Sequence, residues 1–186
     1  MSSIWKRVWM IAASLLLIGS GGVLLGYHLI LHRIASRMMT PRLAASAEAP
    51  DDLAYRTLDG AEQHLSSTKG QVVFLDLWGT WCIQCVAEMP TVQKLYDHYR
   101  NDPQVKFLIV SRLDSPATVR AFAQLHHYDL PFYVMNDEDI PVSMRLNQYP
   151  ATFIYAKDGM LMSKHVGAAN WATPSVISFI NGLQAR

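Results

Sequence analysis

The two cysteines of this chain lie where an apolar run gives way to a segment with helical patterning. Residues 71–77 are mostly apolar, which is typical of a strand buried on both faces of a sheet. Residues 82–99 repeat apolar side chains at helical spacing, so Cys82 stands at the start of a predicted helix and Cys85 one turn later. A helix N-terminus favours the thiolate, the form of cysteine that attacks disulfides. The pair therefore predicts thiol–disulfide exchange.

Two other functions of a Cys-x-x-Cys pair fit the sequence less well. Tetrahedral zinc needs four ligands, and the chain has no further cysteine, while its seven histidines are scattered. A purely structural disulfide across two residues closes so short a loop that it removes little entropy from the unfolded chain. We therefore favour redox chemistry over a metal site or a structural disulfide.

The cysteine region resembles the active site of the thioredoxin superfamily. The matching positions outside the cysteines are Asp76, Trp78, Trp81, Pro90 and the run Tyr149-Pro150-Ala151-Thr152-Phe153. In that superfamily they correspond to a buried acid, two tryptophans beside the cysteines, a proline that kinks the active-site helix, and a loop whose cis-proline faces the cysteines. Because cis peptide bonds are essentially confined to proline, the resemblance implies a cis bond at Pro150.

Further positions resemble the membrane-anchored TlpA/ResA-like branch of the superfamily. They are Ala49-Pro50, Leu58-Asp59-Gly60, Leu65, Gly70, Glu88 and the run Gly-Ala-Ala-Asn-Trp at 167–171. The resemblance covers about residues 48–184. Two features depart from the relatives. The dipeptide Ile83-Gln84 replaces the Gly-Pro of typical thioredoxins, and the proline loop at 148–152 lacks the Gly-x-Pro-Glu-Thr form usual in the cytochrome-maturation subfamily.

The resemblance and the helix placement together imply four catalytic residues. Cys82 and Cys85 are expected to form the redox-active disulfide, with Cys82 attacking the partner and Cys85 then releasing it. Burial raises the pKa of a thiol, so Cys85 needs a proton acceptor, and Asp76 and Glu88 are the two candidates. Each acid also has a simpler interpretation, because Asp76 could be a locally bonded strand residue and Glu88 could lie on a solvated helix face.

Three residues are expected to bind the substrate. Tyr149 and Pro150 would present their backbone to a bound chain by strand-like pairing. Trp81, beside the cysteines, would shape the contact surface, although an aromatic that only packs against its neighbours is the alternative.

The pattern along the chain predicts a thioredoxin-like α/β fold. A small hairpin over residues 53–57 and 63–65 precedes strands over 71–77, 105–110, 132–135, 152–156 and 160–166. Helices are predicted over 82–99, 116–127, 137–146 and 173–183, with Ser115 and Thr173 as caps. Alternating strands and helices that end in a hairpin indicate a mixed central sheet with helices on both faces.

The N-terminus predicts a membrane anchor. Residues 8–31 carry no formal charge and reach about 36 Å as a helix, enough to span a bilayer. A cleaved signal peptide is the alternative, but its small-residue site would have to lie directly behind a shorter apolar run. We expect a cytoplasmic head (1–7), a transmembrane signal anchor (8–31), a tether (32–47) and a thioredoxin-like domain (48–186). The protein is then expected in a bacterial inner membrane, with its domain facing the periplasm or the outside.

Three classes of function remain. A net charge of +1 gives no electrostatic reason to bind nucleic acid. We expect an extracytoplasmic thiol–disulfide oxidoreductase without cofactor or metal, whose partners are a disulfide-bearing protein or cytochrome precursor and a membrane electron donor. A copper(I)-handling dithiol module is the second class. A thiol peroxidase of the peroxiredoxin family is the third, but its Pro-x-x-x-Thr-x-x-Cys signature is absent from the sequence.

The direction of electron flow can also be argued from the sequence. A strong oxidant needs a stabilised reduced form, which means a very acidic first cysteine. Ile83 and Gln84 carry no charge, and no Lys or Arg lies between Asp76 and Pro90, so the helix terminus alone lowers the pKa of Cys82. We therefore expect a reductase, with an oxidising exchange protein as the alternative.

Overall fold

The computed structural model describes residues 22, 23, 26, 29, 40, 41, 43 and 52–185. The chain divides into a unit of residues 1–37 and a unit of residues 38–186. In the first unit, the four described residues are helical. Among the described residues, no helix is long and apolar enough to cross a membrane. The predicted head, most of the predicted span and most of the predicted tether lie outside the described residues.

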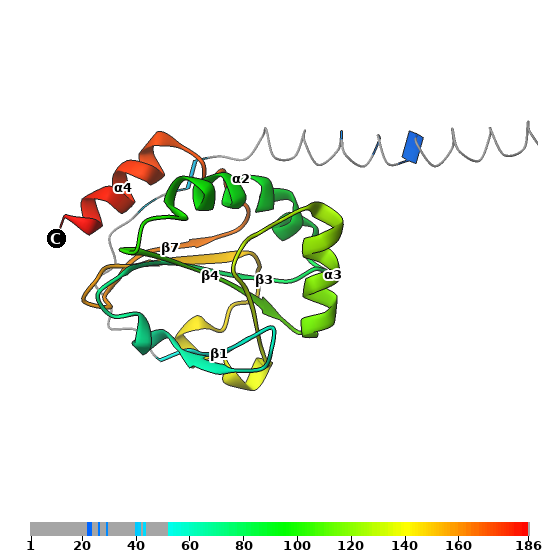
Figure 1. Ribbon diagram of the computed structural model, residues 1–186, viewed down its shortest axis with the longest axis horizontal. Helices are drawn as coiled ribbons and strands as arrows, with labels where there is room; N and C mark the ends of the chain where they lie inside the picture. Colours follow the sequence, from blue (N-terminus) through cyan, green and yellow to red (C-terminus); the bar gives the residue numbers. More distant parts are fainter. Residues whose placement is uncertain are drawn as a thin grey trace, which may run out of the picture. The chain divides into compact units, whose positions relative to one another are not determined.

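The second unit is built on one mixed sheet of seven strands in the order β2-β1-β5-β4-β3-β6-β7 (Figure 1). The strands are β1 (Ala54–Thr57), β2 (Glu62–His64), β3 (Val72–Trp78), β4 (Val105–Arg112), β5 (Phe132–Met135), β6 (Ala151–Tyr155) and β7 (Leu161–Val166). The three central strands β5, β4 and β3 are parallel to one another, whereas the β1–β2 hairpin and the β6–β7 hairpin are added antiparallel at the two sides. The predicted thioredoxin-like mixed sheet is confirmed.

Three α-helices pack on one face of this sheet: α2 (Ile83–Tyr99), α3 (Pro116–His126) and α4 (Pro174–Gln184). Figure 1 shows α2 and α4 next to each other, and Tyr99 at the end of α2 donates a hydrogen bond to the carbonyl oxygen of Ile177 in α4 (3.1 Å). All three helices contribute to one core cluster with the β3 residues Val72, Phe74 and Trp78. Successive side chains of a strand point to opposite faces, so these alternate residues define the helix-covered face.

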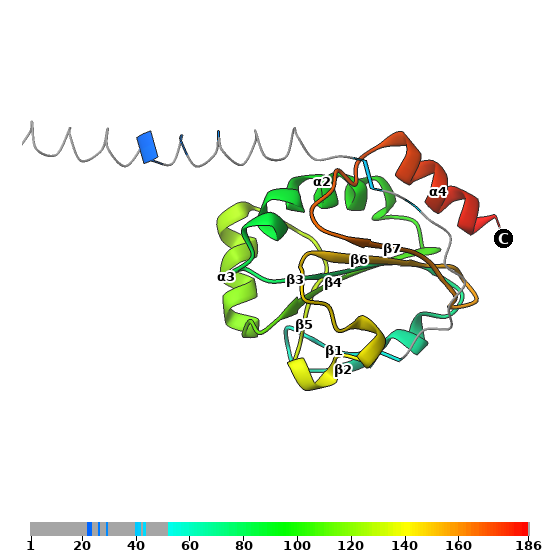
Figure 2. The same cartoon turned by 180° about the vertical axis from the view of Figure 1, so that it is seen from behind.

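The opposite face is covered by short elements. Val73, Leu75 and Leu77 of β3 belong to a second core cluster with Ile140 and Met144. The predicted helix over 137–146 is instead two 3₁₀ turns, η2 (Asp137–Asp139) and η3 (Val142–Met144), and a third one, η1 (Leu65–Thr68), follows β2. Helices thus lie on both faces, but those of the second face are 3₁₀ turns, because Pro141 separates η2 from η3 and prevents one continuous α-helix. Figure 2, the same cartoon seen from behind, shows the short yellow elements on the side of the sheet away from α2 and α4.

The helix starts follow from local chemistry. The Ser115 hydroxyl accepts a hydrogen bond from the backbone N–H of Thr118 (3.1 Å), and Thr173 caps α4 in the same way. Pro116 and Pro174 occupy the first turns, where a missing N–H costs nothing. Both predicted caps are confirmed. The predicted end of α3 is one residue too long, since His127 takes a left-handed conformation that closes the helix.

Candidate active site

The cysteines lie at the start of α2, directly after β3. Cys82 is the N-cap residue, and its sulfur accepts a hydrogen bond from the backbone N–H of Cys85 (3.2 Å). The two residues form a disulfide, with a Cα–Cα distance of 5.2 Å. Cys82 is 8% exposed and Cys85 is fully buried. An incoming thiol or disulfide therefore reaches the sulfur of Cys82 first.

The loop between β3 and Cys82 is held by an acid from a neighbouring connection. The Asp114 carboxylate accepts hydrogen bonds from the backbone N–H and the hydroxyl of Thr80 (2.7 and 2.8 Å). The same carboxylate accepts a hydrogen bond from the Ser111 hydroxyl at the end of β4 (2.6 Å). Asp114 thereby fixes the residues before Cys82 to the adjacent strand. Sequence reasoning missed this contact because 34 residues separate Thr80 from Asp114.

Trp81 is both packed and exposed. Its indole lies over Gly79, where an added Cβ would come within 2.3 Å of Nε1, so only glycine leaves room for the ring. The indole N–H donates to the Arg112 carbonyl oxygen (3.1 Å), and the ring meets Tyr149 edge to face at 6.0 Å. Even so, 52% of Trp81 is exposed. The side chain is thus held in one orientation while it presents an apolar surface beside Cys82.

The loop that leads into β6 contains a cis peptide bond between Tyr149 and Pro150, at the position that the resemblance implies. The Arg112 guanidinium lies 4.9 Å from the centre of the Tyr149 ring. Arg112 also forms a bidentate ion pair with Asp137 (2.5 and 2.7 Å), which raises the pKa of the guanidinium. The positive charge of Arg112 is therefore neutralised by the carboxylate of Asp137. Nothing in the sequence indicated that Arg112 would lie beside Tyr149.

Asp76 is fully buried in the middle of β3. It alternates with Phe74 and Trp78, so its side chain is on the face that α2 covers. Thr152, its register partner on β6, donates a hydrogen bond to Oδ1 at 3.4 Å. Burial raises the pKa of Asp76 to about 7, and the Thr152 hydroxyl opposes this effect. An acid with such a pKa can gain or lose a proton at neutral pH.

Glu88 is also fully buried, so the interpretation as a solvated helix residue is wrong. Its Oε2 accepts hydrogen bonds from the indole N–H of Trp171 (2.9 Å) and the backbone N–H of Ala169 (3.0 Å). Burial raises the pKa of Glu88 well above its ordinary value, the charge of Asp76 raises it further, and these two hydrogen bonds oppose the rise. Thr91, one turn later, accepts a hydrogen bond from the backbone N–H of Trp171 (3.1 Å).

The structure thus brings the seven predicted residues to the carboxyl end of β3 and the start of α2, and adds several that sequence reasoning missed. The added residues are Gly79, Thr91, Arg112, Asp114, Ala169 and Trp171, together with Thr152, which the sequence named only as part of the run at 149–153. The Gly-Ala-Ala-Asn-Trp run at 167–171 was the one signal for Ala169 and Trp171, but nothing in it pointed to Glu88. The other contacts join residues that are far apart in the sequence, so no local pattern could predict them.

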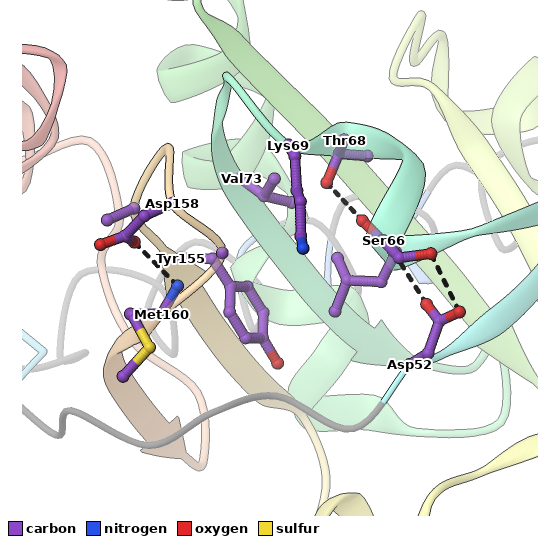
Figure 3. Close-up of a pocket in the computed structure, with 11 residues that line it drawn as sticks. Asp52, Ser66, Thr68, Lys69, Val73, Tyr155, Asp158 and Met160 are labelled. Atoms are coloured by element: carbon purple, nitrogen blue, oxygen red, sulfur yellow. Dashed lines mark hydrogen bonds between the residues drawn. The ribbon is translucent and has the colours of Figure 1, made fainter.

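A metal site and a binding cavity outside the cysteine region have less support. Within the described part of the chain, no group of three or more His, Cys, Asp or Glu side chains could hold a metal ion. A cavity of about 320 Å³ lies at the opposite end of β3, lined by residues such as Val73 and Tyr155 (Figure 3). Its rim includes Asp52, which accepts two hydrogen bonds from Ser66 (2.8 and 3.0 Å). None of the seven predicted site residues lines it.

These features define a protein of the thioredoxin fold with a disulfide at a helix start. The chain belongs to the AhpC/TSA family, whose profile matches residues 45–164. It is 30% identical over 164 residues to the thiol-disulfide oxidoreductase ResA of Halalkalibacterium halodurans, covering 87% of this chain and 88% of that protein. It is 36% identical over 122 residues to the thioredoxin-like protein YneN of Bacillus subtilis, covering 64% and 70%. The chain is a thiol–disulfide oxidoreductase of the ResA type.

Solved structures share the fold at lower sequence identity. A thiol:disulfide interchange protein from Bacteroides sp. superposes with a TM-score of 0.64 at 19% identity, over 76% of this chain and 93% of that one. StoA from Bacillus subtilis superposes with a TM-score of 0.55 at 22% identity, over 67% and 93%. The resemblance to the thioredoxin superfamily is confirmed.

Proposed function

We propose that this protein is a membrane-anchored, extracytoplasmic reductase of disulfides in a partner protein or cytochrome precursor. The observation that carries the direction is the charge around the cysteines. Two acids, Asp76 and Glu88, are buried on the helix-covered face, and the Arg112 guanidinium beside Tyr149 is paired with Asp137. Acids near a thiol raise its pKa and leave the reduced form without special stabilisation. A cysteine pair whose reduced form is not specially stabilised has a low redox potential and therefore acts as a reductant.

The reaction then follows from the exposure of the two sulfurs. The Cys82 thiolate attacks one sulfur of the partner disulfide, forms a mixed disulfide, and expels the other sulfur as a thiolate that takes up a proton. The buried Cys85 loses its proton to an adjacent acid and attacks the sulfur of Cys82. This step breaks the mixed disulfide, releases the second partner thiol, and leaves the Cys82–Cys85 disulfide. Two electrons have moved from the protein to its partner.

The surface around Cys82 fits an apolar segment of an unfolded or flexible protein. Three apolar side chains in this region are more than half exposed, namely Trp81 (52%), Ile83 (65%) and Leu113 (62%). The cis-proline loop lies beside Trp81, and its Tyr149 backbone is suited to pair with an extended chain. Pro150 itself has no N–H, and its carbonyl oxygen accepts a hydrogen bond from the Gly167 N–H (2.9 Å). An extended substrate would lie across the surface formed by Trp81 and Tyr149, with its disulfide over Cys82.

The anchor and the electron donor are proposed from the sequence. Residues 8–31 would hold the protein in the bacterial inner membrane, and residues 32–47 would let the domain reach a membrane protein that reduces the cysteine pair. The ResA name of the relatives supports a redox role of this type.

A defined peptide tests the proposed reaction. A Cys-x-x-Cys-His peptide, the attachment sequence for c-type haem, is oxidised to its internal disulfide and mixed with the reduced protein. We expect reduction of the peptide, visible as a gain of two hydrogens by mass spectrometry, and no reduction by the Cys82→Ser variant. Net oxidation of the reduced peptide by the oxidised protein would instead show an oxidant. Tight copper(I) binding by a reduced protein that leaves the peptide unchanged would show a metal-handling module.

A further inference from the structure

One arginine contacts both aromatic side chains of the docking surface, which is formed by Trp81 and Tyr149. Arg112 is the last residue of β4. Its carbonyl oxygen accepts a hydrogen bond from the Trp81 indole N–H (3.1 Å), and its guanidinium lies 4.9 Å from the centre of the Tyr149 ring. The two rings meet edge to face, with their centres 6.0 Å apart. Arg112 thus joins two side chains that come from distant segments of the sequence.

Asp137, the first residue of η2, fixes the guanidinium of Arg112. Its two carboxylate oxygens accept hydrogen bonds from Nε and Nη2 (2.5 and 2.7 Å), a bidentate geometry that matches the planar fork of arginine and that lysine does not reproduce. The Arg112 side chain is 22% exposed, so the pair is partly shielded from water. Because the carboxylate offsets the positive charge, the contribution of Arg112 to the site lies in its shape, a flat group held against the Tyr149 ring.

The backbone after Arg112 is strained where it serves these contacts. Leu113 has a left-handed conformation (φ 67°), which is unfavourable for a residue with a Cβ. The next residue, Asp114, accepts hydrogen bonds from the backbone N–H and the hydroxyl of Thr80 (2.7 and 2.8 Å). Two consecutive residues of the loop before the cysteines, Thr80 and Trp81, are therefore held from the two sides of Leu113. Strain persists where the surrounding contacts over-determine the conformation, so this corner of the chain is a rigid support for the docking surface.

A second arginine–acid pair on the same turn has a different destination. Arg56 of β1 donates a hydrogen bond to Asp139, two residues after Asp137 (3.2 Å). The same guanidinium also pairs with Glu62 of β2 (3.3 Å). The η2 turn therefore carries two ion pairs, of which one leads to the docking surface through Arg112 and the other leads to the β1–β2 hairpin. This arrangement supplies a matched control for the first pair.

We propose that Arg112 is the positioning residue of the docking surface. Its pairing with Asp137 fixes how Trp81 and Tyr149 lie relative to each other, and thereby sets the affinity for an extended segment of a disulfide-bearing protein. In this role Arg112 acts through the two rings and not on the sulfurs. The inference rests on the proposed function, from which it takes docking across these rings, but it does not depend on the reducing direction.

The kinetic test separates binding from chemistry. Reduced full-length protein is mixed with an excess of the oxidised Cys-x-x-Cys-His peptide, extended by apolar residues on both sides, at rising concentrations. A single round of reduction then gives a limiting rate and a half-saturating concentration. We expect Asp137→Asn and Arg112→Lys each to raise the half-saturating concentration about fivefold or more and to keep the limiting rate within about twofold of the wild type. Asp139→Asn should match the wild type in both quantities.

A structural measurement needs no substrate and also shows whether the variants fold. The nuclear Overhauser effect between the Trp81 and Tyr149 rings should be present in the wild type and in Asp139→Asn, and weaker or absent in Asp137→Asn and Arg112→Lys. An unchanged half-saturating concentration, or an unchanged Overhauser effect, in Asp137→Asn would overturn the positioning role. Equal losses in Asp139→Asn would overturn it as well, because the whole η2 turn would then be responsible.

Failure of the proposed function gives a different result. A wild-type protein that reacts with the aromatic disulfide DTNB but leaves the peptide unreduced would count against reduction of protein disulfides. The Overhauser effect in the Asp137→Asn and Asp139→Asn variants would then decide the positioning role of Arg112 by itself.

Discussion

Cys82 and Cys85 are three residues apart, yet their surroundings give them different chemistry. Cys82 caps α2 and keeps some exposure, whereas Cys85 is fully buried one turn into the helix. The helix terminus favours the thiolate at Cys82 and burial disfavours it at Cys85. The Cys-x-x-Cys spacing in the sequence was enough to predict this asymmetry, because it depends on the helix start alone.

The asymmetry predicts different results for the two serine variants. Cys82→Ser should abolish reduction of a model disulfide. Cys85→Ser should keep the first attack and accumulate mixed disulfide, which mass spectrometry of the intact protein detects. Alkylation of the reduced wild-type protein at mildly acid pH should label Cys82 first. Equal labelling of both cysteines, or faster labelling of Cys85, is the result that this assignment does not allow.

The orientation of Trp81 depends on the absence of a side chain at Gly79. An added methyl would lie 2.3 Å from the indole, so Gly79→Ala should displace the ring and its edge contact with Tyr149. We expect the rate of reduction of a protein substrate to fall about tenfold or more. The rate of reaction with DTNB, a small aromatic disulfide, should change little, since a small reagent needs no docking surface. Stopped-flow rates for both substrates measure this difference.

Gly182→Ala in α4 is the matched control, because nothing lies within 4 Å of its added Cβ. An alanine inside a helix should raise the free energy of unfolding by about 0.5–1 kcal/mol and leave both rates unchanged. Equal losses toward the two substrates in Gly79→Ala would mean that Trp81 acts on Cys82 itself and not on docking.

At the scale of the elements, α2 is joined to the segment before α4 by buried hydrogen bonds. Glu88 and Thr91 both bond residues 169–171, about 80 positions later in the chain. Apart from the helix over 137–146, strand and helix positions could be predicted to within a few residues, because hydrophobic periodicity and caps are local. The contacts of Glu88 could not be predicted, because the sequence around a glutamate at that helix position looks the same whether a loop or water covers its side chain.

This connection predicts that Trp171 stabilises the fold partly through Glu88. Trp171→Phe removes the indole N–H from Oε2 but keeps an aromatic ring in the core, and should lower the free energy of unfolding by about 1–3 kcal/mol. Urea denaturation measures the change. Trp81→Phe, at a half-exposed indole, should cost less. A larger loss at Trp81 than at Trp171 would contradict this account of the α2 contact.

At the scale of the whole molecule, the buried acids couple stability to pH. The pKa of Asp76 is about 7 in the folded protein and near its ordinary value when unfolded, so the folded state binds more protons between these values. The contribution of Asp76 to stability is therefore largest below its unfolded pKa and falls as pH rises toward 7, with a slope of up to about 1.4 kcal/mol per pH unit for one proton.

We therefore expect the free energy of unfolding to decrease between about pH 5 and pH 7. Asp76→Asn should flatten this dependence, because the folded protein then has one carboxyl less to protonate. Urea titrations at several pH values measure both curves. A wild-type stability that is constant or rises over this interval would show that Asp76 ionises in the fold as readily as in the unfolded chain.

The reducing direction is the central claim, and the redox potential of the Cys82–Cys85 couple tests it most directly. The full-length protein is equilibrated with glutathione buffers of graded ratio, quenched with acid, alkylated, and scored for reduced cysteines by mass. The site contains two buried acids, its Arg112 is paired with Asp137, and the sequence between residues 76 and 90 has no Lys or Arg. We therefore predict a redox potential well below about −180 mV, the value of protein disulfide isomerase. A potential near about −120 mV, typical of a strong oxidant, would contradict the proposal.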